Sequence, residues 1–265
     1  EGNWLATGSR VPVGAQSVSY DFAGGAYEKD GTVVSAASAV SCVRSTVGYA
    51  STVGGNWQQF AVNEPRITNR GLLVEPAFQN LQTHSGTPSN AVWIKNDVTL
   101  GSPVDGYTPV RETVANSFHR LFSSTFLITT GITYGQTWFV RKAGRQHLVA
   151  RINRGDATQR QVCFDLDAGA VVYADAELTA SVVKRGAALQ LKVSFVAAGT
   201  GALGTAGLLT APAAVMNNNI PSFAGETDKG FDFFCFNFGE GADAGSPIIP
   251  SGSAATRAAD AVTLN

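Results

Sequence analysis

The sequence predicts an all-β protein, a β-sandwich preceded by an extended, strand-poor N-terminal arm. The chain holds 29 glycines among 265 residues and only 15% charged residues. This composition, with many Val, Thr, Ala and Ser residues, favours strands and turns over helices. From about residue 91 onward, short apolar runs alternate with glycines, which is typical of sandwiches. The length allows one large β domain or two modest ones.

The first 62 residues have a different composition, rich in Gly, Ala, Ser and Val, and glycine pairs interrupt their apolar stretches. Ordering a backbone costs about 1–2 kcal/mol per residue, and this segment buries little to offset that cost. We therefore expect an arm that neighbouring subunits or the main domain must order, with residues 48–58 as an exposed aromatic loop or an intersubunit plug. We divide the chain into an arm with its motif segment, residues 1–84, and a sandwich domain, residues 85–265.

The stretch from Asn63 to Leu81, NEPRITNRGLLVEPAFQNL, carries the densest turn signals of the sequence. Pro65 and Pro76 each fix φ and lack a backbone donor, so neither fits the middle of a regular strand ladder. Between them, residues 69–71 (Asn-Arg-Gly) predict a turn, and the short apolar run at 72–74 predicts a strand.

In the sandwich domain a first strand is expected at residues 91–95, and Pro and Asp-Gly chemistry predicts a turn at 102–106. The segments 161–166 and 170–173 predict a hairpin. Further strands are expected at residues 118–128, 137–141, 148–152 and 189–195, the last with the clearest alternation of apolar and polar residues.

Two later segments differ from this regular pattern. Residues 197–222 are a low-complexity Gly/Ala/Thr stretch and predict a long irregular loop. Residues 231–238 carry aromatic side chains on both faces, which predicts a central strand packed between two layers at the core of the fold.

Charge and hydropathy argue against a nucleic-acid-binding protein and against a membrane-spanning protein. With 19 basic and 20 acidic residues the net charge is −1, so we expect no nucleic-acid partner. No run reaches the roughly 18 apolar residues that span a bilayer, and we expect no membrane insertion. The first ten residues lack the pattern of a signal peptide, and the start at Glu1 instead of Met leaves open a fragment or a processed product. The three cysteines are an odd number without C-x-x-C spacing, which predicts buried free thiols.

Two motifs resemble a known family. The first runs through CVRSTVGYASTVGG and AVNEPRITNRGLLVEPAFQNLQTHSG, and the second is the closing GSPIIPSGSAATRAADAVTL. Both are similar to sequence patterns of bacteriophage and prophage virion proteins. The first motif rests on Arg44, Ser45, Thr46, Tyr49, Asn63, Pro65, Arg66, Gly71, Leu72, Leu73, Glu75, Asn80 and Leu81. The second rests on Ser246, Pro247, Ile248, Pro250, Thr256, Arg257, Ala258, Ala259 and Asp260. The family's usual Ala-Arg-Thr-Asn-Leu is replaced here by residues 77–81, and its Trp-Gly-Ala-Gln-Leu-Glu by residues 236–240.

The resemblance implies a carbohydrate-binding-module-like jelly roll of the concanavalin A-like type. It also implies a structural role at the virion surface, in a head spike, tail fibre or decoration component. Other virion proteins would then be partners, with a homotrimer by analogy with phage fibres and a cell-surface polysaccharide as a further partner. No cofactor is implied.

The closing segment, residues 245–264, is expected to return to the first motif. Pairing Arg66 with Glu64 or Glu75 would pin that motif, although a solvated charge cluster is the alternative. The returning segment would bring Arg257 and Asp260 to these residues, which makes both motifs structural. The competing idea, that Arg257 and Asp260 form a ligand site, lacks an aromatic platform.

Sugar binding needs flat aromatic rings and a few polar groups. The candidates are Trp138, Arg141, His147 and Tyr173. For Trp138 the alternative is an ordinary core residue, since β-sandwiches bury tryptophan routinely.

The alternative function is a polysaccharide-degrading, tailspike-like or glucanase-like enzyme, which needs two carboxylates across a cleft. The candidates cluster around the predicted hairpin, where alternate carboxylates are usually a solvated edge: Asp165, Asp167, Asp175 and Glu177. Asp165 with Asp167 could also hold a structural calcium ion. No G-x-S-x-G elbow accompanies the three histidines, so the sequence predicts no catalytic residues.

Overall fold

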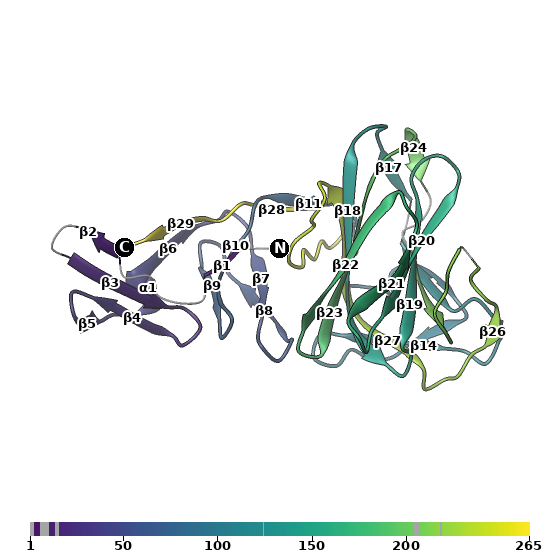
Figure 1. Cartoon of the computed structure of the whole chain (residues 1–265), viewed down its shortest axis with the longest axis horizontal. Coiled ribbons are helices and arrows are strands. Elements are labelled where there is room, and N and C mark those ends of the chain that lie inside the picture. The colour runs from purple at the N-terminus through teal and green to yellow at the C-terminus, as the bar shows by residue number, and fades with distance from the viewer. Residues whose placement is uncertain (1–2, 6–10, 14–15, 124, 204–206, 218) are drawn as a thin grey trace. The chain divides into compact units, whose positions relative to one another are not determined.

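The computed structural model describes residues 3–5, 11–13, 16–123, 125–203, 207–217 and 219–265. The regular secondary structure of these residues is almost entirely β-strand, with one short helix, α1 (Ala36–Ala39) (Figure 1). The all-β class is therefore confirmed. The chain forms two compact units: the first is Glu1–Phe78 with Gly245–Ile248 and Thr256–Asn265, and the second is Gln79–Ala244 with Ile249–Ala255.

The described part of the first unit consists of small antiparallel sheets. They are β1 (Asn3–Leu5) with β10 (Gly71–Val74) and β9 (Arg66–Thr68); β2 (Val11–Val13), β3 (Gln16–Asp21), β4 (Ala26–Lys29) and β5 (Thr32–Val33); β29 (Ala261–Leu264) with β6 (Val40–Val43); and β7 (Gly48–Ser51) with β8 (Trp57–Phe60). The last strand of the chain thus pairs with a strand from its first fifth, with Val262 opposite Cys42.

The expectation of a strand-poor arm is wrong for the described residues. The segment has its own core, in which Tyr20, Phe22, Tyr27 and Val40 pack with Leu72 of the motif segment. The glycine turns connect short strands, and partners distant in sequence supply the apolar surface that the segment lacks. Residues 48–58 likewise form the β7–β8 hairpin and not a loop. The parts of the expected arm at residues 1–2, 6–10 and 14–15 lie outside the described residues.

The second unit is a β-sandwich of two six-stranded antiparallel sheets. Strands of both sheets, such as β18 and β20, are labelled in Figure 1. The first sheet has the order β12 (Ile94–Asn96), β16 (Arg120–Phe122), β25 (Gly207–Ala211), β19 (His147–Asn153), β20 (Gln159–Asp165) and β21 (Ala170–Ala174). The second has the order β13 (Val98–Leu100), β14 (Thr108–Glu112), β27 (Gly230–Glu240), β18 (Thr133–Ala143), β23 (Ala188–Val196) and β22 (Leu178–Arg185). Two short pairs complete the strands of this unit: β15 (Asn116–Ser117) with β26 (Phe223–Ala224), and β17 (Phe126–Ile128) with β24 (Gly201–Leu203). A further pair, β11 (Phe78–Asn80) with β28 (Ala255–Arg257), has residues of both units in its strands.

The core lies between the two sheets. Leu121, Ala150 and Val162 of the first sheet belong to the same buried cluster as Trp138 and Phe236 of the second. Strand β27 pairs with β14 on one side and with β18 on the other. The prediction of a central aromatic strand at residues 231–238 is therefore confirmed.

The predicted loop at residues 197–222 is wrong in its first half. It contains β24 and β25, and β25 pairs with both β16 and β19 inside the first sheet. Its buried residues Leu208 and Leu209 face opposite sides of the sheet. Apolar partners on both sides therefore overrode the loop-forming composition of the surrounding Gly, Ala and Thr residues.

Other predictions met mixed outcomes. The hairpin of β20 and β21 is present, whereas the strand expected over residues 118–128 is divided into β16 and β17. The three cysteines are free and buried, as predicted. No helix of the described residues is long and apolar enough to cross a membrane.

Candidate functional site

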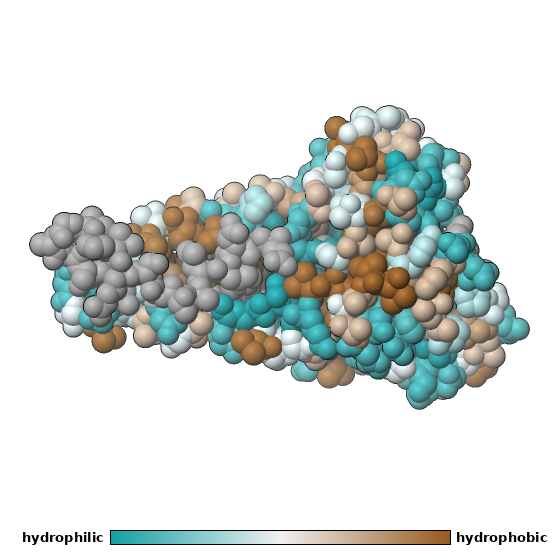
Figure 2. Space-filling view, in the orientation of Figure 1, coloured by the Kyte–Doolittle hydropathy of each residue, from teal (hydrophilic) through white to brown (hydrophobic). Residues whose placement is uncertain are grey.

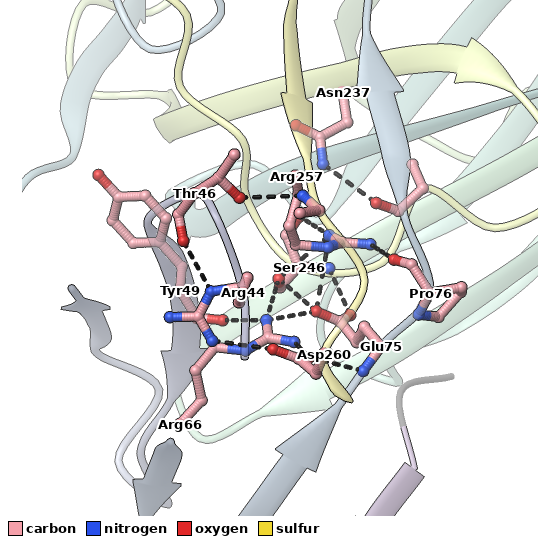
Figure 3. A network of polar contacts seen from close by, with 12 residues as sticks. Arg44, Thr46, Tyr49, Arg66, Glu75, Pro76, Asn237, Ser246, Arg257 and Asp260 are labelled. Atoms are coloured by element: carbon pink, nitrogen blue, oxygen red, sulfur yellow. Dashed lines mark hydrogen bonds and ion pairs between the residues drawn. The ribbon is translucent and has the colours of Figure 1, made fainter. Parts of the chain in front are cut away.

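In the first unit, charged side chains from the opening and closing parts of the chain meet in one buried network (Figure 3). Arg44 follows β6, Arg66 begins β9, Glu75 follows β10 and Asp260 precedes β29. Because β6 pairs with β29 and β9 pairs with β10, strand pairing brings these four positions into reach of one another.

Asp260 is the central acceptor. Its Oδ1 accepts a hydrogen bond from Nη1 of Arg44 at 2.8 Å. Its Oδ2 accepts from the backbone N–H of Glu75 at 2.8 Å and from Nη2 of Arg66. Two guanidinium groups and a backbone amide therefore compensate the cost of burying this charge.

Glu75 is the second acceptor, and Ser246 and Arg257 of the closing segment surround it. Its Oε2 accepts from Nη1 of Arg66 at 2.5 Å and from Oγ of Ser246 at 2.6 Å. Its Oε1 accepts from the backbone N–H of Ser246 at 2.8 Å. Arg257 lies 3.5 Å from Oε2 and donates to the carbonyl oxygens of Ser246 and Pro76. The predicted return of the closing segment to the first motif is therefore confirmed at Arg66 and Glu75.

The network carries a net charge of +1, because three guanidinium groups, those of Arg44, Arg66 and Arg257, oppose the two carboxylates of Glu75 and Asp260 (3 − 2). Their side chains are between 0% and 3% exposed. Removing one member of such a buried ion pair leaves the charges of the remaining members uncompensated, which is destabilising. With protein donors bound to both carboxylates, the arrangement ties the closing segment to the first motif within this unit.

Two glycines make room for this network. A Cβ at Gly48 would lie 2.8 Å from Cδ of Arg66 and 3.1 Å from Cζ of Arg44. Gly245 has φ +63°, and a Cβ there would lie 2.6 Å from Oε1 of Glu75. Each position therefore requires the absence of a side chain, and Gly245 also requires the left-handed backbone that glycine favours.

The other motif residues predicted as structural have local roles. Asn63, at φ +60°, exchanges hydrogen bonds with the backbone of Arg44. The carbonyl of Pro65 accepts a backbone N–H, and Gly71 starts β10 at φ +114°. Asn80 belongs to the second unit, where its buried side-chain amide bonds the backbone of β27 on both sides. Of the two carboxylates expected as partners of Arg66, Glu75 pairs with it and Glu64 does not.

Glu64 instead closes its own turn. Its Oε2 accepts the backbone N–H of Ala61 at 2.7 Å, and the residue is exposed.

Two of the four proposed sugar contacts lie on β18. Trp138 is fully buried, with its ring centroid 4.2 Å from that of Phe236, so it is a core residue and presents no platform. Arg141 stacks its guanidinium over the ring of Tyr107 at 3.8 Å, and its Nη1 lies 3.7 Å from Asp105.

The other two lie on the opposite sheet. Nε2 of His147 on β19 lies 4.0 Å from Asp165, and Oη of Tyr173 on β21 donates to Asp175 at 2.5 Å. The four residues are therefore divided among the core and two different sheets, and the structure does not bring them together as one site.

The carboxylates of the hairpin region all have protein partners. Oδ1 of Asp165 accepts backbone N–H groups of its own turn, and the bond from Ala168 is the main cause of its lowered pKa. Asp167 pairs with Lys142 at 2.5 Å. A hydrogen bond from Arg160 is the main cause of the lowered pKa of Glu177. No cluster of three or more His, Cys, Asp or Glu residues that could hold a metal occurs within the described ranges.

The second unit contains a buried ion pair of its own. Glu112 accepts from Nε of Arg145 at 2.7 Å and from Nη2 at 2.6 Å, and its Oε2 also accepts the backbone N–H of Glu226. Burial alone would raise the pKa of Glu112, but the hydrogen bonds, led by those from Arg145, lower it overall. The bidentate pair joins β14 to the turn that follows β18.

Sequence reasoning missed the central place of Arg44 and Ser246. Both belong to the motifs that resemble the virion family, but neither has a sequence neighbour that suggests a partner. Their partners, Asp260 and Glu75, lie 216 and 171 positions away. Only the pairing of the closing segment with the first motif could have indicated these contacts.

No family model matches the chain, and the search of curated proteins found no match. Fold and site together define a two-unit all-β protein whose first unit is closed by a buried arginine–carboxylate network.

Proposed function

We propose that this chain is a non-enzymatic structural protein of a phage-like virion, a head spike, tail fibre or decoration component at the particle surface. One observation carries the proposal. The five charged residues of the network all belong to the two motifs that resemble virion proteins: Arg44, Arg66, Glu75, Arg257 and Asp260. The resemblance thus rests on residues that close a structural unit, which is the expectation for a scaffold protein.

The second unit is proposed to be the glycan-presenting jelly roll. Its chain passes repeatedly between the two sheets, as from β12 to β13 and from β18 to β19, a pattern compatible with the jelly-roll class. Host-surface polysaccharide is the proposed ligand, and the exposed side chains of β21 and β22 are part of the available surface.

Assembly into a homotrimer is part of this proposal. In the part of the first unit whose burial is described, six aliphatic residues have exposed side chains: Val33, Val43, Val47, Val53, Val62 and Leu264. Figure 2 shows hydrophobic residues among hydrophilic ones on the face in view. Contacts with other subunits or other virion proteins would bury such side chains.

The enzymatic alternative, a polysaccharide-degrading tailspike-like protein, finds less support. It needs two carboxylates free to face a substrate, whereas Asp167 and Glu177 are paired with Lys142 and Arg160.

Particles purified from the source organism provide the test. Antibody labelling in electron microscopy should place the chain on the surface of heads or tails, and mass spectrometry should find it in the same fraction. Recovery of the chain only from the soluble fraction, with none in intact particles, would refute the proposal. Shortening of host polysaccharide by the purified protein would favour the enzyme.

A further inference from the structure

Two arginines lie near each other on the outer face of the first six-stranded sheet, and neither forms an ion pair with a carboxylate of the described residues. Arg120 lies on β16 and Arg151 on β19, and only β25 runs between these strands. Arg120 is opposite Leu209, whose other neighbour is Val149. Both Leu209 and Val149 belong to the cluster on the face that points away from the sandwich core. Since residues two apart share a face, Arg151 points the same way as Val149.

An aromatic ring packs against the strand that runs between the two arginines. Phe122, Gly207 and Arg151 stand opposite one another in register. A Cβ at Gly207 would lie 1.5 Å from the ring of Phe122, so this ring covers the glycine. Cζ of Arg120 stacks over the same ring at 4.5 Å. The stacking leaves the edge of this guanidinium available for hydrogen bonds.

A buried amide without a partner completes the group. Gln161 on β20 stands opposite Arg151 and is 0% exposed. Among the described residues, neither Oε1 nor Nε2 of its side chain has a hydrogen-bond partner, and Nε of Arg151 has none either. A buried amide without hydrogen-bond partners lowers the stability of the fold unless a bound group supplies those hydrogen bonds.

The carboxylate of Asp175, which lies beside Gln161, does not fill this role. Oδ1 of Asp175 accepts from Oη of Tyr173, and Oδ2 accepts from the backbone N–H of Gln161. Arg120 donates through Nε to the neutral side chain of Asn96 at 2.8 Å. Within the described chain, neither Arg120 nor Arg151 forms an ion pair.

The surroundings disfavour both positive charges. Burial lowers the pKa of Arg151, and the charge of Arg120 lowers it further. Burial also lowers the pKa of Arg120, partly opposed by the negative charge of Asp97. An anion bound between them would relieve both effects.

We propose that Arg120, Arg151 and Gln161 bind a single oxyanion, a carboxylate or phosphate group carried by a sugar of an acidic polysaccharide. Guanidinium groups match the planar, two-oxygen geometry of such groups, and Nε2 of Gln161 supplies a further donor. That the oxyanion belongs to a polysaccharide rests on the proposed function. The site itself rests only on the side chains described above.

Calorimetric titration of the full chain tests this site with three probes: inorganic phosphate, a tetrasaccharide of alternating glucuronate and N-acetylglucosamine, and neutral cellotetraose. The acidic tetrasaccharide should bind and cellotetraose should not. Arg151→Gln should weaken acidic binding by about tenfold or more. Arg185→Gln, which removes an equal charge from β22 in the other sheet, should leave it unchanged.

An NMR measurement covers the case in which Arg151→Gln does not fold. The Nε–Hε resonance of Arg151 in the native protein should shift on addition of the acidic tetrasaccharide. Equal affinities of native and Arg151→Gln protein, or an unshifted resonance at saturating ligand, would overturn the inference. If native and Arg151→Gln protein bound host polysaccharide with equal affinity, this site would be overturned while the proposed function would stand. Binding of the acidic probes by a chain absent from particles would support the site and refute the virion role.

Discussion

Replacing Asp260 with asparagine should open the first unit while leaving the second unit folded. The carboxylate of Asp260 pairs with Arg44 and Arg66, and all three side chains are at most 1% exposed. Asparagine keeps the shape but removes the charge, and the net charge of the buried network rises from +1 to +2. Leaving buried guanidinium groups without their partner costs about 3–5 kcal/mol. This is a large share of the stability of a unit of this size.

Hydrogen exchange with mass spectrometry measures the protection of backbone amides in the two units separately. Peptides from β6, β9 and β10 should exchange faster in Asp260→Asn by a factor that matches this loss, and peptides from β18 and β27 should exchange at the native rate. The matched control is Asp243→Asn in the second unit. Asp243 pairs with Lys192 at 2.9 Å but is 35% exposed, so its loss should cost no more than about 1 kcal/mol. Equal protection of the first unit in native and Asp260→Asn protein would refute the structural role of the network.

Three further predictions concern single positions. Glu112→Gln should remove a pH-dependent contribution. Because the folded-state pKa of Glu112 is lowered, this contribution is present above its unfolded-state pKa and is lost as the pH falls through the folded-state pKa. Between about pH 7 and pH 3, the free energy of unfolding measured with denaturant should therefore fall less in the variant than in the native protein. An equal fall in the two proteins would contradict this. Gly245→Ala should destabilise the first unit by about 1–3 kcal/mol, because its new Cβ would meet Glu75 2.6 Å away at φ +63°; a melting temperature equal to the native one would count against it. The thiol of Cys235, which is fully buried with a pKa raised by that burial, should react with a thiol reagent only after unfolding, and rapid native-state labelling would show otherwise.

The regular strands of the second unit could be predicted from local pattern. Residues 189–195 alternate strictly, and the structure places them in β23. The aromatic run at residues 231–238 has apolar residues on both faces, and it forms the long strand β27. Periodicity succeeds in such segments because burial on one or both faces dictates the residue types.

Local pattern failed where distant partners decide the structure. The segment around Val40 lacks the apolar content for a sheet of its own, yet β6 forms because β29 pairs with it. Strand β25 is likewise stable in a low-complexity stretch because β16 and β19 flank it. In the site, the pairing of Arg66 with Glu75 could be anticipated because they lie nine positions apart. The contact of Arg44 with Asp260 could not, since no local signal links them.

The most direct test of this account is removal of the closing segment, followed by its return as a separate peptide. A chain ending at residue 244 lacks Ser246, Arg257, Asp260 and β29, and hydrogen exchange should show β6, β9 and β10 unprotected while β18 and β27 keep their protection. A peptide of residues 245–265 should bind this chain and restore the lost protection, and the same peptide with Asp260→Asn should bind at least about tenfold more weakly. A shortened chain that protects its first unit as well as the full chain would contradict the claim that the closing motif completes this unit.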